Sequence, residues 1–300
     1  MLRWRLLLGA VFIAALIGLF TLDYQAPFPG VVLFPLALLL SWLAAGEILW
    51  LLAARDLRPR PGIVRLGALA VVASNLVAAI DPTTPLASLG WPAAAFALAV
   101  LAAFLGEMHR YERPGEVMER LGLTVMALAY VGLLLSFVAQ MRLLGPEGGR
   151  LGSWGVAALA SLVITVKMCD IGAYTLGRLF GRHKMSPVLS PGKTWEGAAG
   201  GIALACLGGW VALNLLAPAL GVEVSFAWAF LPYGVLVGGC GILGDLAESL
   251  IKRDVGRKDS SAWMPGFGGV LDLLDSVLFA APVAFLLWKL GLIAANPAIG

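Results

Sequence analysis

The sequence contains little charge. Asp, Glu, Lys and Arg together make up 13% of its 300 residues, whereas hydrophobic residues make up 60%. Soluble domains carry about 25% charged residues, so this composition excludes an ordinary soluble protein. The hydrophobic residues fall in repeated runs of roughly 15 to 25 residues, the length that a helix needs to cross a bilayer. The fold class that we predict is therefore all-α, a polytopic integral membrane protein with about nine transmembrane helices.

The expected spans divide into two halves that differ in chemistry. Residues 1–150 hold about five spans with few ionisable side chains, and Glu47, Asn75 and Glu107 there are expected to snorkel or to form interhelical hydrogen bonds. Residues 151–300 hold the other spans and two polar loops, 178–197 and 252–269. The nine spans are Leu6 to Leu22, Val31 to Ala53, Leu66 to Ile80, Trp91 to Leu105, Leu121 to Val138, Trp154 to Leu176, Ala198 to Leu216, Phe226 to Ile251 and Val270 to Leu290.

Cysteines and targeting signals are also scarce. The three cysteines, Cys169, Cys206 and Cys240, lack metal-site spacing and the even count of a disulfide framework, so we interpret them as packing residues. The N-terminal stretch has the basic start and apolar core of a signal peptide, but TLDYQAPFPG after it offers no small-x-small cleavage site. We expect an uncleaved first helix. We find no transporter-like internal repeat and no low-complexity segment.

Basic residues predict the orientation, because lysine and arginine are retained on the cytoplasmic side of short loops. One side keeps only Arg142, Arg150 and Lys289. The formal net charge of +3 then reflects topology, and we expect no nucleic-acid partner. The prediction is a multi-pass protein of the inner (plasma) membrane, with its N-terminus and both polar loops in the cytoplasm. The residues on the cytoplasmic side are Arg3, Arg5, Arg55, Arg58, Arg60, Arg65, Arg110, Arg113, Arg120, Arg178, Arg182, Lys184, Lys193, Lys252, Arg253, Arg257 and Lys258.

Polar residues of the eighth span form a stripe at its cytoplasmic end. In GDLAESLIKR, positions i, i+4 and i+7 share one helix face, so Asp245, Ser249 and Lys252 point the same way, with Glu248 beside them. A carboxylate near the bilayer core costs on the order of 2.5 to 3.5 kcal/mol on insertion scales. Several of them therefore need compensating partners, which bound cations would supply.

The ninth span begins with two further carboxylates. Asp272 and Asp275 are three residues apart and share a face. Carboxylates that converge from two helix ends suit magnesium, which prefers oxygen ligands and shares its shell with phosphate, and either one or two cations fit. Gly266, Gly268 and Gly269 would let the backbone approach a ligand. The alternative is that these charges cap the helices and mark the membrane surface.

The sixth span and the loop after it carry the remaining polar residues. Lys167 and Asp170 are three apart in the sixth span and able to pair, and an ion pair alone would explain both. The loop contains SPGKTWEG, in which Ser190, Lys193, Thr194 and Glu196 offer hydroxyl, cationic and acidic groups. The alternative for this stretch is a turn followed by a helix cap. It is not a Walker A loop, because the upstream glycines are absent.

These residues resemble the phosphatidate cytidylyltransferase, or CDP-diacylglycerol synthase, family. The resemblance covers roughly Lys167 to Phe279, in the blocks CDIGAYTLGRLFGRHKMSPVLSPGKTWEG, GDLAESLIKR and KDSSAWMPGFGGVLDLLDS. The family signature runs from a serine and a Lys-Arg pair through Lys-Asp to His-Gly-Gly and Asp-Arg-x-Asp. The matching positions are Ser249, Lys252, Arg253, Lys258, Asp259, Gly268, Gly269, Asp272 and Asp275. Phe267 and Leu273 depart from it, since they stand where the family has histidine and arginine.

The resemblance implies transfer of a cytidylyl group from CTP to phosphatidate in the bilayer, which gives CDP-diacylglycerol and pyrophosphate. It implies a magnesium site at Asp245, Asp272 and Asp275, catalytic roles for these three and for Ser249 and Lys252, and a catalytic C-terminal half. The substrate-binding set that it implies is Ser190, Lys193, Thr194, Glu196, Arg253, Lys258, Asp259, Gly268 and Gly269. Asp259 is included because it matches the family signature, and we assign it no separate chemical role.

Three alternatives remain at this point. The protein could use CTP on another membrane lipid, such as an isoprenoid alcohol or its phosphate. It could be a non-catalytic paralogue that lost turnover together with the departures at Phe267 and Leu273. An ion or solute transporter also places acids and lysines within helices, but it should show access from both sides of the membrane. A homodimer is compatible with the sequence, which does not specify the oligomeric state.

Overall fold

The computed structural model describes residues 2–54, 58–80, 86–145, 151–261 and 268–294. The described chain is almost entirely helical, which confirms the all-α prediction, and two short strands form the exception. The elements are α1 (Leu2–Gln25), α2 (Leu33–Leu52), α3 (Pro61–Ala73), α4 (Asn75–Ile80), α5 (Ala87–Arg110), α6 (Val117–Ala127), η1 (Leu128–Leu133), α7 (Leu134–Leu143), α8 (Leu151–Phe180), β1 (Lys184–Ser186), β2 (Ser190–Thr194), α9 (Trp195–Trp210), η2 (Val211–Leu216), α10 (Ala217–Ala219), α11 (Phe230–Asp254) and α12 (Val270–Lys289).

All nine expected spans fall in helices, although they differ in length. Within the described residues, seven helices are long and apolar enough to cross a membrane. The expected span 6–22 lies within α1, and the expected span 66–80 falls in a shorter apolar stretch, Pro61–Val77. The helix that contains 66–80 is interrupted at Ser74, which separates α3 from α4. The polytopic membrane architecture is confirmed, with seven helices of spanning length and further apolar helices among the described residues.

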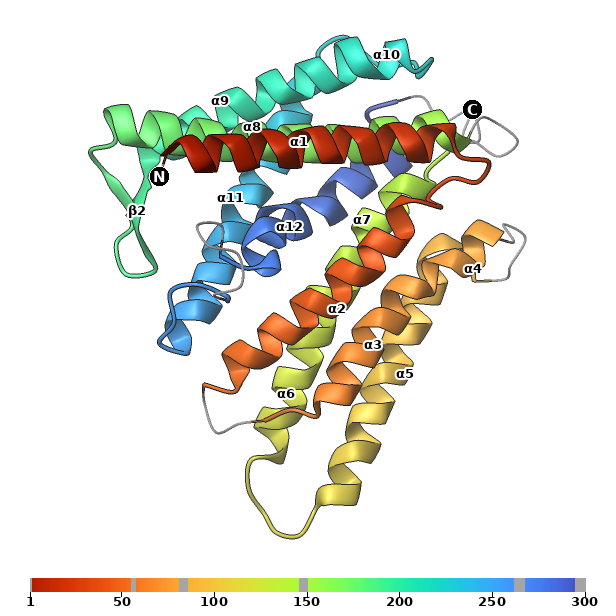
Figure 1. Cartoon of the computed structure of the whole chain (residues 1–300), viewed down its shortest axis with the longest axis vertical. Helices are drawn as coiled ribbons and strands as arrows, with labels where there is room; N and C mark the ends of the chain where they lie inside the picture. Colours follow the sequence, from red (N-terminus) through yellow and green to blue (C-terminus); the bar gives the residue numbers. More distant parts are fainter. Residues whose placement is uncertain (1, 55–57, 81–85, 146–150, 262–267, 295–300) are drawn as a thin grey trace.

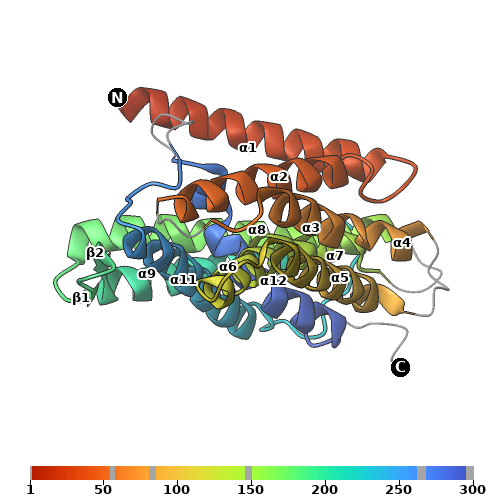
Figure 2. The same cartoon turned by 90° about the horizontal axis from the view of Figure 1, so that it is seen from below.

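The helices form two groups that meet along α12. In Figure 1, α2, α3, α5 and α6–α7 form one group, while α8, α9, α11 and α12 form the other. Figure 2 shows α1 as an outer layer over α2 and α8. One buried core joins Met141 of α7 to Leu162 and Trp288, and a second joins Ile48 of α2 to Leu271 of α12. Both cores thus contain residues from before and after position 150.

Interhelical polar contacts in the first half agree with two of the expectations made for it. Asn75 donates a hydrogen bond to the Ser136 hydroxyl across 2.7 Å. Glu107 pairs with Arg120 at 2.8 Å. The three cysteines are free thiols, as expected for packing residues.

The two strands form a small antiparallel hairpin after the end of α8, where we expected only a polar loop. Lys184 pairs with Thr194, and Ser186 pairs with Ser190. Thr194 then caps α9, because its hydroxyl accepts a hydrogen bond from the Gly197 amide at 3.1 Å. The alternative interpretation of this stretch, a turn followed by a helix cap, is correct for the cap at Thr194, whereas residues 190–194 form a strand in place of a turn. It does not exclude a functional role, since Thr194 also lines the cavity described next.

Candidate active site

A cavity of about 630 Å³ lies between the hairpin and helices α8, α9, α11 and α12. Its size falls within the range of about 300 to 1,000 Å³ that is typical of small-molecule sites. Among the described residues, its charged lining side chains are five carboxylates and three cations, namely Asp170, Asp245, Glu248, Asp272, Asp275, Arg178, Lys193 and Lys252. Of the expected site residues, the cavity brings together Asp245, Asp272, Asp275, Lys252, Ser190, Lys193 and Thr194.

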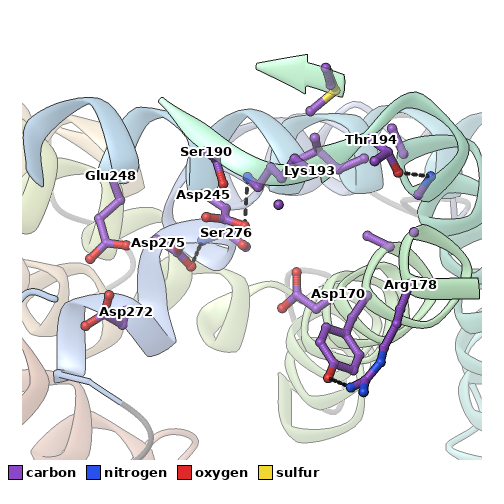
Figure 3. A pocket seen from close by; sticks show the side chains of 18 of the residues that line it. Asp170, Arg178, Ser190, Lys193, Thr194, Asp245, Glu248, Asp272, Asp275 and Ser276 are labelled. Carbon is purple, nitrogen blue, oxygen red and sulfur yellow. Dashed lines mark hydrogen bonds and ion pairs between the residues drawn. The ribbon is translucent and has the colours of Figure 1, made fainter. Parts of the chain in front are cut away.

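Asp245 and Asp275 meet because α11 and α12 approach closely at Gly244. A Cβ atom on Gly244 would lie 2.4 Å from the Asp275 carbonyl oxygen and 2.9 Å from Phe279 Cβ, so only glycine allows this approach. Figure 3 shows Asp245 and Asp275 together near Ser276. The Asp275 carboxylate accepts a hydrogen bond from the Ser276 amide at 2.5 Å. One glycine thus places two carboxylates from different helices at one point of the cavity.

Lys193 reaches this pair from the hairpin. Its Nζ lies 2.7 Å from an Asp245 carboxylate oxygen, and the two side chains are 20% and 42% exposed. The dashed line between them in Figure 3 marks this contact between β2 and α11. Because Lys193 sits on a short hairpin and Asp245 on a long helix, this ion pair holds the hairpin over the carboxylates.

Lys252 lies between two carboxylates on the other side of the cavity. Its Nζ is 2.7 Å from Glu248 Oε2, one helical turn earlier, and 2.5 Å from Asp272 Oδ1 of α12. The Glu248 side chain is only 1% exposed, so Lys252 is the partner that makes its burial tolerable. This lysine therefore ties α11 to α12 and keeps one further donor available, because an ammonium group has three.

Asp272 is heavily engaged within the protein. Besides Lys252, it accepts hydrogen bonds from the Ser260 hydroxyl at 2.5 Å and from the Gly269 amide at 2.7 Å. The alternative interpretation of Asp272 as a helix cap is thus correct in its geometry, since it occupies the first turn of α12. Its carboxylate oxygens would need to exchange partners before they could bind a metal ion.

Glu47 of α2 is a site-supporting residue that sequence reasoning missed. Its carboxylate accepts hydrogen bonds from the Val270 and Leu271 amides at 2.9 and 2.8 Å, so it caps the N-terminus of α12. It also accepts from the hydroxyls of Ser260 and Ser261. Part of the first half of the chain therefore holds the helix that carries Asp272 and Asp275. This goes beyond the snorkelling or simple interhelical role expected for Glu47.

Glu196 and Arg253 lie outside the cavity lining and support the hairpin. Glu196 accepts hydrogen bonds from the His183 amide and pairs with His183 Nδ1 at 2.5 Å. Arg253 Nε donates to the Leu189 carbonyl at 3.2 Å. The first contact lies at the open end of the hairpin and the second at its turn, next to Ser190.

The other expected residues also lie beyond the lining. Ser249 is half-buried on α11, while Lys258 and Asp259 are exposed. Gly268 takes a left-handed φ of +79°, and Gly269 is the N-cap of α12. Gly266 and Phe267 lie outside the described residues. Of the two departures from the signature, only Leu273 is described, and its carbonyl accepts a hydrogen bond from Lys167 at 3.3 Å. The expected Lys167–Asp170 pair is present at 3.0 Å.

The carboxylates fit a metal ion that is shared with a substrate better than a metal ion held by the protein alone. Within the described part of the chain, no three His, Cys, Asp or Glu side chains are arranged to hold an ion together. Magnesium, however, is typically bound by one or two carboxylates together with substrate phosphates and water. Asp245 and Asp275 provide such a pair in a cavity whose lining carboxylates outnumber its cations.

A comparison with known protein families identifies the family of this chain. The model of the cytidylyltransferase family matches residues 4–290, nearly the whole chain. The chain belongs to the cytidylyltransferase family. The match extends well beyond the region of the three sequence blocks and includes the N-terminal helices.

The chain is also similar to several curated proteins. The phosphatidate cytidylyltransferase of Mycobacterium leprae is 43% identical over 162 residues, which are 54% of this chain and 47% of that protein. The phosphatidate cytidylyltransferase of Staphylococcus saprophyticus is 36% identical over 160 residues, 53% of this chain and 55% of that protein. An Escherichia coli protein named uncharacterized protein YnbB is 36% identical over 163 residues, 54% of this chain and 49% of that protein.

These matches confirm the resemblance to phosphatidate cytidylyltransferases. The chain spans about half the length of the curated relatives that it matches. Family membership is thus established over nearly the whole chain, whereas the similarity to individual relatives covers about half of each.

Proposed function

We propose that the protein transfers the cytidylyl group of CTP to phosphatidate, which gives CDP-diacylglycerol and pyrophosphate. The observation that carries this proposal is the cavity in which Lys193 of the hairpin meets the carboxylates of α11 and α12, in a chain of the cytidylyltransferase family. Two anionic substrates must be brought together, and a cavity that holds both cations and paired carboxylates can do so once a metal ion adds positive charge.

The reaction needs alignment more than acid–base chemistry. A phosphate oxygen of phosphatidate attacks the α-phosphorus of CTP, a new P–O bond forms, and the bond to the oxygen that bridges the α- and β-phosphorus breaks. Pyrophosphate leaves with the electron pair of that bond. The attacking phosphate is already an anion at neutral pH, so no strong general base is required. Positioning and charge neutralisation then supply most of the rate enhancement.

The residues of the cavity divide this work. We assign Lys193 to the triphosphate, with the hydroxyls of Ser190 and Thr194 beside it on the hairpin. Lys252 keeps Asp272 and Glu248 in place and has one donor left for a phosphate oxygen. Glu196 and Arg253 act through the hairpin, because Glu196 pairs with His183 just before its first strand and Arg253 contacts its turn at Leu189.

Asp245 and Asp275 are the residues that we assign to magnesium, and Asp272 would join them if its present partners were exchanged. A bound magnesium ion supplies charge neutralisation for the triphosphate and polarisation of the phosphoryl oxygens. Without it, five carboxylates and three cations would face a triphosphate, and their summed charge would repel it.

We propose that the cavity faces the cytoplasm from the inner (plasma) membrane. Arg178 lies at the end of α8, and Lys193 lies in the hairpin that follows it. Both are on the side of the membrane that carries most of the basic residues. CTP would then enter from the cytosol, while the acyl chains of phosphatidate stay in the bilayer. Labelling single cysteines placed at 188 and at 223 with a membrane-impermeant reagent, in intact cells, measures this orientation directly.

An acceptor panel with labelled CTP tests the function. The purified protein is incubated with phosphatidate, an isoprenoid phosphate or an isoprenoid alcohol, and the labelled lipid product is identified. We expect product from phosphatidate, a loss of at least 100-fold in Asp245→Asn, and wild-type activity in Glu223→Gln, an exposed residue far from the cavity. Product from an isoprenoid acceptor alone would replace the proposed substrate. Nucleotide binding without any product would indicate a non-catalytic paralogue.

A further inference from the structure

Arg178 is the cavity cation that lacks a carboxylate partner. Three cations line the cavity within the described residues, and two of them, Lys193 and Lys252, are held in ion pairs with carboxylates. The guanidinium of Arg178 instead donates to the hydroxyl of Tyr174 at 2.8 Å, and it forms no ion pair with any described residue. A cavity-lining guanidinium without a counter-charge is suited to bind an anion from outside the protein.

Arg178 also lies where the cavity meets the lipid. It occupies the last turn of α8, one helical turn after Tyr174. Its apolar neighbours Leu179 and Phe180 are 72% and 62% exposed, as expected for side chains that contact lipid at the membrane–water interface. The end of a membrane-spanning helix lies at the level of the lipid headgroups. Arg178 is therefore both part of the cavity wall and next to the headgroup layer.

The cavity separates Arg178 from most of the carboxylates. Figure 3 shows Arg178 and Asp170 on one side, with Glu248 and Asp272 across from them. The one carboxylate beside Arg178 that lines the cavity, Asp170, is already paired with Lys167 at 3.0 Å. This arrangement leaves a positively charged position at the end of the cavity opposite Glu248 and Asp272.

We propose that Arg178, positioned by Tyr174, binds the phosphate group of the lipid acceptor. The ligand class is a phosphomonoester carried by a membrane lipid, which the planar guanidinium can grip through two parallel hydrogen bonds. This inference rests on the proposed function, and it deepens that function by assigning the lipid and the nucleotide to opposite sides of one cavity. It also gives a reason for selecting a lipid phosphate over a lipid alcohol, because an alcohol offers no charge to Arg178.

The test measures the binding of each substrate separately. Dissociation constants for short-chain phosphatidate and for CTP with magnesium are determined by calorimetry on the detergent-purified protein, for wild type, Arg178→Gln, Arg178→Lys and Tyr174→Phe. The matched control is Arg182→Gln, which removes the same charge four residues later from a residue that does not line the cavity. An unchanged CTP affinity shows in each case that the variant is folded.

We expect Arg178→Gln to weaken phosphatidate binding by about 10- to 100-fold, the usual worth of a charge-assisted hydrogen bond, and to leave CTP binding within about twofold. Arg178→Lys should fall between wild type and Arg178→Gln, and Tyr174→Phe should show a smaller loss. Weaker CTP binding with normal phosphatidate binding would place the triphosphate at Arg178 and overturn the proposal. An equal loss in Arg182→Gln would reduce the effect to general surface charge and would also overturn it.

Failure of this inference and failure of the proposed function give different results. If wild type makes CDP-diacylglycerol and Arg178→Gln binds phosphatidate normally, only the role of Arg178 is wrong. If wild type neither binds phosphatidate nor converts it, the proposed substrate is wrong, whatever the variants do.

Discussion

The Lys252 cluster makes a quantitative prediction about stability. Lys252→Met would remove the cation that lies 2.7 Å from Glu248 and 2.5 Å from Asp272. Glu248 would then be a carboxylate with 1% side-chain exposure and no compensating charge. Removing one partner of a buried ion pair typically costs about 3 to 5 kcal/mol. The loss of Lys252 would destabilise the Asp272 carboxylate less, because the Ser260 hydroxyl and the Gly269 amide still donate hydrogen bonds to it.

The double variant Glu248→Gln with Lys252→Met provides the matched control. It removes both charges together, so most of the lost stability should return, while activity should stay low if Lys252 also contacts a phosphate. Stability is measured as the apparent melting temperature and the urea midpoint in one detergent, and activity as pyrophosphate release. A Lys252→Met protein as stable as wild type, or a double variant less stable than Lys252→Met, would refute the assignment of Lys252 as the partner of a buried carboxylate.

Three further variants test other parts of the structure. Glu47→Gln should lower stability by about 1.5 to 3 kcal/mol, because a charged acceptor for four donors at the start of α12 becomes neutral. The urea midpoint measures this loss, and an unchanged midpoint would contradict the capping role. Gly244→Val should force α11 and α12 apart and abolish turnover, whereas activity near that of wild type would disprove the close approach. Phe267→His with Leu273→Arg should retain or raise pyrophosphate release with phosphatidate, and a complete loss would indicate a site rebuilt for another substrate.

Much of the fold followed from the sequence because the bilayer imposes simple rules. The apolar runs located all seven helices of spanning length among the described residues. Hydropathy alone could not distinguish α3 and α4 from one continuous span. Carboxylates three or four residues apart were correctly placed on shared helix faces. Asp245 and Asp275 could be expected near each other because both lie at the ends of neighbouring spans.

Contacts between distant parts of the chain could not be predicted in this way. Glu47 caps α12 across 223 and 224 residues of sequence, and no local pattern indicates that partner. The hairpin was missed because its strands are three and five residues long and carry no clear alternation. Arg178 looked like a topology signal, since its position in the cavity wall depends on how α8 packs against α9.

The most direct test of the account is pyrophosphate release from CTP by the purified protein, with phosphatidate and magnesium added or withheld one at a time. The account predicts release only when all three components are present, and a return to background when magnesium is removed by a chelator. Release that does not require phosphatidate, or that persists after chelation, would contradict the proposed reaction at Asp245 and Asp275.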